Sequence, residues 1–156
     1  IITVIEGESV ALTVDGTTET LERHRPFTFD GGAETRADLP HGPIRDLNLI
    51  ARTDVANAAV SVEVLRIERP YRLSEGQYCV LLQGQALLGM DVSNADSVPS
   101  TGVELGLCDT VLGDAGHPWT VTGEGILAVV SVAGIAVAGV AATNSAPSPS
   151  EPTGLR

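Results

Sequence analysis

The stretch of sequence richest in potential site chemistry is PHGPIRDLNLIAR, residues 40–52. It places an imidazole, a carboxylate and an amide close together, in His41, Asp46 and Asn48. Such groups can hold a small polar ligand by hydrogen bonds, or an acid and a base among them can transfer protons when both reach one substrate. Gly42 and Pro43 indicate a turn that shapes the approach to these side chains.

The residues after this turn, 44–51, are typical of a β-strand with apolar side chains on both faces. Because alternate side chains of a strand share a face, Asp46 and Asn48 lie together on one of them. A strand covered on both sides would bury Asp46, and a buried carboxylate needs a partner. Two interpretations follow. The pair fastens a neighbouring turn or loop, with Asp46 bonded to backbone N–H groups or an Arg, or both side chains line a pocket inside a barrel.

Other catalytic signatures are missing from the sequence. The chain contains no Lys, no P-loop and no GxSxG motif, which excludes a lysine Schiff base and two common enzyme classes. The histidines, His24, His41 and His117, form no HxH or HxxxH pair, so we expect neither a metal site nor a cofactor. Cys79 and Cys108 fit no zinc or CxxC spacing and are typical of buried thiols, although one disulfide between them is compatible with the sequence.

Short apolar segments separated by Gly, Pro and Asp predict an all-β fold. The pattern restarts after Arg69-Pro70, which indicates two β-modules, residues 1–68 and 69–142. Residues 143–156 are rich in Ser and Pro and are predicted to be a disordered tail. Strands are expected at residues 1–6, 9–14, 17–21, 26–29, 34–39, 44–51, 60–67, 78–82, 86–90, 103–107, 110–112 and 126–137.

The net charge of −11 repels phosphate backbones and anionic lipids, so neither a nucleic acid nor a membrane is an expected partner. Residues 125–142 are almost wholly apolar, but three glycines and the lack of flanking basic residues favour a buried final strand with an extension over a membrane span. The chain shows no signal peptide, and a cytoplasmic location is expected. It starts directly in a strand, which we interpret as the loss of an N-terminal segment.

Residues 12–52 resemble the HutD/Ves family of bacterial double-jelly-roll proteins, or bicupins. The features that carry the resemblance are a hairpin with Gly16, the strand at residues 26–29 before Gly31-Gly32, and above all the pattern Gly42-Pro43-x-x-Asp46-x-Asn48. In outline it extends over residues 1 to 133. It implies a cupin-like double jelly roll that lacks the usual metal ligands. Family members carry a segment rich in Trp, Asn and Gly before the first strand, and nothing in this sequence corresponds to it.

The family is associated with histidine utilisation, the bacterial pathway of histidine catabolism. The resemblance therefore implies a non-enzymatic regulator that binds a small carboxylated metabolite, of the urocanate or formylglutamate class, through His41, Asp46 and Asn48. The alternative is a metal-independent cupin-like isomerase or hydrolase with Asp46 as base and His41 as acid. A purely structural jelly roll is the third hypothesis. A homodimer is compatible with each of them.

Overall fold

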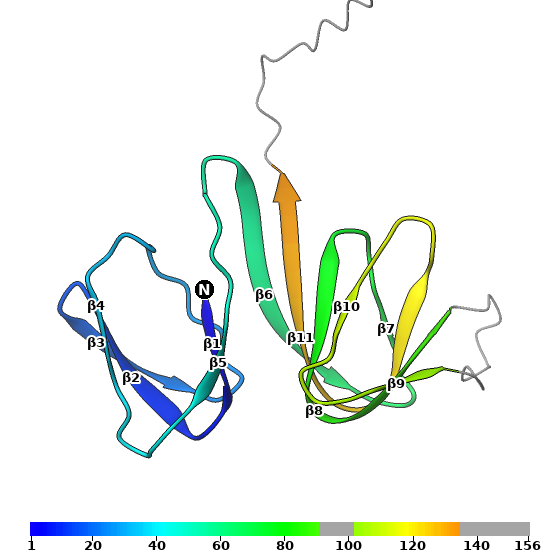
Figure 1. Ribbon diagram of the computed structural model, residues 1–156, viewed down its shortest axis with the longest axis horizontal. Coiled ribbons are helices and arrows are strands. Elements are labelled where there is room, and N and C mark those ends of the chain that lie inside the picture. The colour runs from blue at the N-terminus through cyan, green and yellow to red at the C-terminus, as the bar shows by residue number, and fades with distance from the viewer. Residues whose placement is uncertain (91–101, 135–156) are drawn as a thin grey trace, which may run out of the picture.

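The computed structural model describes residues 1–90 and 102–134, and within them the chain forms strands and turns but no helix (Figure 1). The all-β class predicted from the sequence is therefore confirmed. The predicted extension after residue 134 and the predicted tail lie outside the described residues. The strands are β1 (Ile2–Glu6), β2 (Ser9–Val14), β3 (Thr17–Glu22), β4 (Thr35–Asp38), β5 (Arg45–Asn48), β6 (Ala56–Leu65), β7 (Tyr71–Arg72), β8 (Gln77–Met90), β9 (Val103–Leu105), β10 (Thr110–Leu112) and β11 (Trp119–Gly134).

Two small antiparallel sheets build the first module, which occupies the left half of Figure 1. One sheet pairs β1 with β5, and the other has the order β3–β2–β4. The β2–β3 hairpin turns at Asp15 and Gly16, whose φ angles are 46° and 81°. These are the left-handed values that a tight two-residue turn requires. Side chains from both sheets form one core, and its buried members are Val4, Val10, Leu12 and Leu21.

A six-stranded antiparallel sheet builds the second module. Its path runs β10–β8–β11–β6, with β7 added to β11 and β9 added to β8. The two longest strands, β8 and β11, pair with each other from Gln77 to Met90 of β8. Both strands curve along this length, so that one face of the sheet encloses a core (Figure 1). The fully buried members of that core are Cys79, Leu81, Val121 and Leu127.

Strand β6 belongs to the sheet of the second module, although the sequence analysis assigns it to the first. Its ten residues pair with β11 along their whole length. The predicted boundary between residues 68 and 69 therefore does not coincide with the division between the sheets, which falls between β5 and β6. Pairing between strands so far apart in sequence is decided by tertiary contacts, and the local break at Arg69-Pro70 carries no information about it.

The two modules pack against each other through one face of the β1–β5 sheet. Ile5 of β1 and Leu47 of β5 join Val80, Leu82 and Ala128 of the second module in one apolar cluster. Burial of a side chain of the size of Ile or Leu contributes about 1.5–3 kcal/mol. This seam therefore holds β5 in a fixed position relative to β8 and β11.

Three glycines allow β8 and β11 to approach each other closely where they bend. A side chain at Gly84 would collide with the carbonyl oxygen of Glu124, and one at Gly123 would collide with the carbonyl oxygen of Gln85. Gly125 is confined by backbone in the same way. Gly84 also has a φ of 94°, in the left-handed region where a side chain costs about 1–2 kcal/mol. The bend therefore depends on the absence of side chains at these positions.

The apolar run at residues 125–142 begins within β11, which extends to Gly134. The predicted final strand is confirmed over this part. Among the residues that the structure describes, no helix is long and apolar enough to cross a membrane.

Because β8 and β11 approach so closely, adding a single methyl group at the bend is predicted to destabilise the fold strongly. Gly84→Ala should lower the free energy of unfolding by roughly 2–4 kcal/mol, because it adds both left-handed strain and a backbone clash. Gly134→Ala is the matched control in the same sheet, since the space around Gly134 is open, and it should change stability by less than about 1 kcal/mol. Chemical denaturation followed by circular dichroism measures both. Equal losses in the two variants would contradict this account of the bend.

Candidate functional site

The structure places Asp46 and Asn48 side by side on β5, with both side chains exposed. The amide Nδ2 of Asn48 donates a hydrogen bond to Oδ2 of Asp46. Asp46 thus has the partner that the sequence analysis required, but the partner is Asn48 rather than an Arg or the turn before the strand. The expectation that this strand is covered on both sides is wrong, because Asp46 and Asn48 on one of its faces are exposed.

The face of β5 that carries these two side chains is the one that looks toward the first module. In the antiparallel register, Asn48 lies opposite Ile2 and Asp46 lies opposite Val4, and opposed residues share a face. Val4 belongs to the buried core of the first module, whereas Leu47 between the two polar residues joins the seam with the second module. The Asp46–Asn48 pair therefore stands at the open side of the first module, next to its core.

The main chain of β5 has an unpaired edge beside these side chains. The nitrogen of Ile1 donates to the carbonyl oxygen of Leu49, and the N–H of Leu49 donates to the carbonyl oxygen of Ile1. Because bonded positions alternate along an antiparallel pair, the N–H groups of Asp46 and Asn48 point away from β1. No described strand pairs with β5 on that side. A ligand at this edge would meet main-chain donors, a carboxylate and an amide together.

The third predicted site residue, His41, lies in the turn before β5 and is bonded in another direction. Its Nδ1 is 3.0 Å from Oγ of Ser9 and 3.6 Å from a carboxylate oxygen of Glu8. Gly42, with a φ of 96°, supplies the left-handed turn conformation that the sequence analysis expected of it, and Pro43 follows it. The structure thus joins Asp46 to Asn48, and it engages His41 with the start of β2.

His24 is a partly buried histidine of the first module that the sequence analysis did not single out. Its main-chain N–H donates to the carbonyl oxygen of Val4 at 2.8 Å, and its φ of 63° is left-handed. The ring Nε2 is buried without a hydrogen-bond partner. Burial, and next the neighbouring charge of Arg23, lower the pKa of His24 below its usual value of 6.5. The folded chain therefore favours the neutral imidazole.

A lowered histidine pKa predicts a loss of stability on mild acidification. The unfolded chain binds a proton at His24 more readily than the folded chain does, so the stabilisation is complete above pH 6.5 and declines as the pH falls toward the folded pKa. His24→Asn retains a side chain that tolerates left-handed φ. Its melting temperature should fall less than that of the wild type between about pH 8 and about pH 5.5, as scanning calorimetry measures. Identical pH profiles for the two proteins would show that His24 is not responsible.

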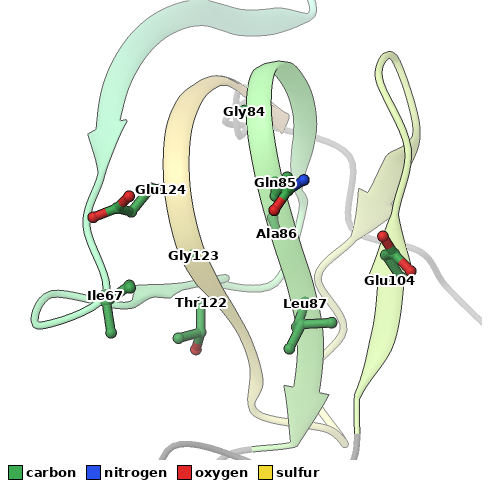
Figure 2. A pocket seen from close by; sticks show the side chains of 9 residues that line it. All are labelled: Ile67, Gly84, Gln85, Ala86, Leu87, Glu104, Thr122, Gly123 and Glu124. Atoms are coloured by element: carbon green, nitrogen blue, oxygen red, sulfur yellow. The ribbon is translucent and has the colours of Figure 1, made fainter.

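The second module contains a cavity of about 660 Å³ at the bend of β8 and β11. Figure 2 shows the side chains that line it, among them Glu104 of β9, Glu124 of β11 and Gln85 of β8. Thr122 of β11 also lines the cavity and is 3% exposed. Its hydroxyl has no hydrogen-bond partner, and an unpaired buried hydroxyl costs roughly 1–3 kcal/mol.

Sequence reasoning missed all four polar residues of this cavity. Glu104 lies in a predicted strand, whereas Gln85, Thr122 and Glu124 lie outside the predicted strands, and no motif joins the four residues. The glycines were the one signal in the sequence for the bend at this cavity, since isolated Gly residues inside strand patterns mark bends or close backbone approach. Gly84 interrupts β8, and Gly123 and Gly125 interrupt β11, where the two strands pair at the cavity.

The side chains that could ligate a metal or act as thiols are scattered over the described part of the chain. Within residues 1–90 and 102–134, no group of three or more His, Cys, Asp or Glu side chains is arranged to hold a metal ion. Cys79 and Cys108 are both free and pack in different apolar clusters, so the structure contains no disulfide between them. Burial raises the pKa of the Cys79 thiol to about 12, which makes it a poor nucleophile at neutral pH.

Comparison with known proteins places these features in a family. A sequence model of the HutD family matches residues 1–129. The chain is 36% identical over 100 residues to Protein Ves of Citrobacter koseri, and this alignment covers 62% of this chain and 50% of that protein. It is 41% identical over 64 residues to Protein Ves of Cronobacter sakazakii, covering 40% of this chain and 35% of that protein. The chain thus spans about half the length, or less, of these curated relatives.

Two solved structures share the fold. HutD from Pseudomonas fluorescens SBW25 superposes with a TM-score of 0.63 at 27% identity, covering 86% of this chain and 67% of that one. A conserved protein of unknown function from Pseudomonas aeruginosa PAO1 superposes with a TM-score of 0.65 at 22% identity, covering 84% of this chain and 68% of that one. These likenesses confirm the all-β, cupin-like double-jelly-roll class. Together with the match over residues 1–129, they show that the chain belongs to the HutD family.

Proposed function

We propose that this HutD-family chain binds a small carboxylated metabolite of histidine breakdown, of the urocanate or formylglutamate class, and thereby tunes histidine utilisation. The observation that carries the proposal is the Asp46–Asn48 pair on the open side of the first module, next to unpaired main-chain donors of β5. The association of the family with histidine utilisation supplies the metabolite class.

The chemistry of this edge matches such a ligand in two respects. Urocanate and formylglutamate each carry an N–H donor and at least one carboxylate. The carboxylate of Asp46 would accept the N–H, and the outward N–H groups of Asp46 and Asn48 would donate to the ligand carboxylate. Hydrogen bonds that involve a charged group contribute about 1.5–3 kcal/mol each, so a few of them support specific binding of a small molecule.

The position of the pair favours binding over a purely structural role. A loop-fastening Asp would be expected to bond to the loop that it fastens, whereas Asp46 bonds only to its strand neighbour Asn48 among the described residues. The apolar seam under Leu47 fixes β5 from behind, so the polar face can remain open without loss of order.

Isothermal titration of the chain with urocanate and with formylglutamate tests this function. We expect saturable binding of at least one of them, accompanied by a rise in melting temperature with ligand concentration. Asp46→Asn should weaken that binding by about tenfold or more, because the substitution removes a charge-assisted acceptor.

The matched control is Asp38→Asn in β4. Asp38 is likewise exposed on a strand of the first module and bonded to a residue two positions away, Arg36 at 3.1 Å. The Asp38→Asn substitution removes the same charge and should leave the affinity for the metabolite unchanged. The proposal would be refuted if neither metabolite bound, or if the two variants lost the same amount of affinity.

A further inference from the structure

We propose that the cavity at the bend of β8 and β11 is a second ligand site, one that takes a small aliphatic cation with two positive groups, such as a diamine. This inference concerns the second module and goes beyond the proposed function of β5. It rests on the charge of the cavity wall, on one unpaired buried hydroxyl and on the spacing of the strands.

The charges of the cavity wall have one sign. Glu104 and Glu124 line it, and the other lining residues that the structure describes carry no charge. Neither carboxylate is bonded to or ion-paired with another described side chain, unlike Glu6, which pairs with Arg45 at 2.8 Å. Two unpaired carboxylates on one concave surface attract a cation and repel the carboxylated metabolite proposed for β5.

Thr122 gives independent support for a ligand. It lines the cavity two residues before Glu124 on β11, its side chain is almost completely buried, and its hydroxyl has no partner. Buried polar groups in folded proteins are nearly always bonded to protein, water or ligand. An ammonium group, which has three donors and no acceptor, can satisfy a hydroxyl oxygen and a carboxylate at once.

The arrangement of the strands indicates a ligand with two cationic ends. Glu124 lies on β11 opposite Gln85 of β8, and Glu104 lies on β9 opposite Leu87 of β8. The two carboxylates therefore stand on strands separated by β8, roughly 12 Å apart at the main chain, because their partners on β8 are also two residues apart. Leu87 supplies an apolar surface between them, and Ile67 adds another on the side of Glu124 (Figure 2). A chain of a few methylene groups with an ammonium at each end fits this pattern of charge, hydrocarbon and charge.

Titration with putrescine, a four-carbon diamine, tests the site, and succinate, the four-carbon dicarboxylate, is the matched probe of opposite charge. We expect saturable binding of putrescine that weakens as salt is added, and no binding of succinate at this cavity. Glu104→Gln and Glu124→Gln should each weaken putrescine binding by about fivefold, and the double variant should abolish it. Glu34→Gln, an exposed acid of the first module, removes the same charge and should have no effect.

Thr122→Val and Thr120→Val separate ligand binding from simple stability. Both threonines are buried on β11 with unpaired hydroxyls, but only Thr122 lines the cavity. Both substitutions should raise the melting temperature without ligand, since each removes an unpaired buried hydroxyl. Only Thr122→Val should weaken putrescine binding. The proposal is overturned if putrescine does not bind, if the double Gln variant binds it as the wild type does, if Glu34→Gln weakens it equally, or if the two valine variants have the same affinity.

Discussion

The pairing of β8 with β11 is the interaction on which the rest of the structure depends. One face of these strands contributes Val80, Leu82 and Ala128 to the seam with the first module, and the other contributes Leu81 and Leu127 to the core of the second. Beyond the bend, the same two strands form the wall of the cavity. The backbones come close enough for this because side chains are absent at the bend, so the position of the cavity follows from three glycines.

The two candidate sites have opposite electrostatic character, which argues for different ligands. The edge of β5 combines one carboxylate with an amide and outward main-chain donors, a set that suits a ligand with both an N–H and a carboxylate. The cavity of the second module presents two carboxylates and a hydroxyl without any basic group in its described lining, a set that suits a cation. In both cases the polar groups lie against a rigid apolar layer, which reduces the ordering that binding requires.

Local patterns predicted the strands well, and long-range contacts decided what those patterns could not. Asp15-Gly16 fixed the β2–β3 hairpin because two left-handed residues are a local requirement. Gly84 suggested a break between two strands, yet β8 passes through it, because the glycine serves the approach of β11. The predicted strand at residues 26–29 is reduced to one bridge between Phe27 and Ile2. The exposure of Asp46 and the partner of β6 likewise depend on which strands become neighbours. The local sequence pattern carries no information about that pairing.

The most direct test of the account is to map both ligands on the backbone amides of one isotopically labelled sample by NMR. Titration with urocanate or formylglutamate should shift the amides of Asp46 and Asn48, whose N–H groups face the open edge of β5. Titration with putrescine should shift those of Gln85, Thr122 and Glu124 around the cavity, and the two sets should not overlap. The account would be contradicted if the carboxylated ligands left β5 unchanged, or if both kinds of ligand perturbed the same residues.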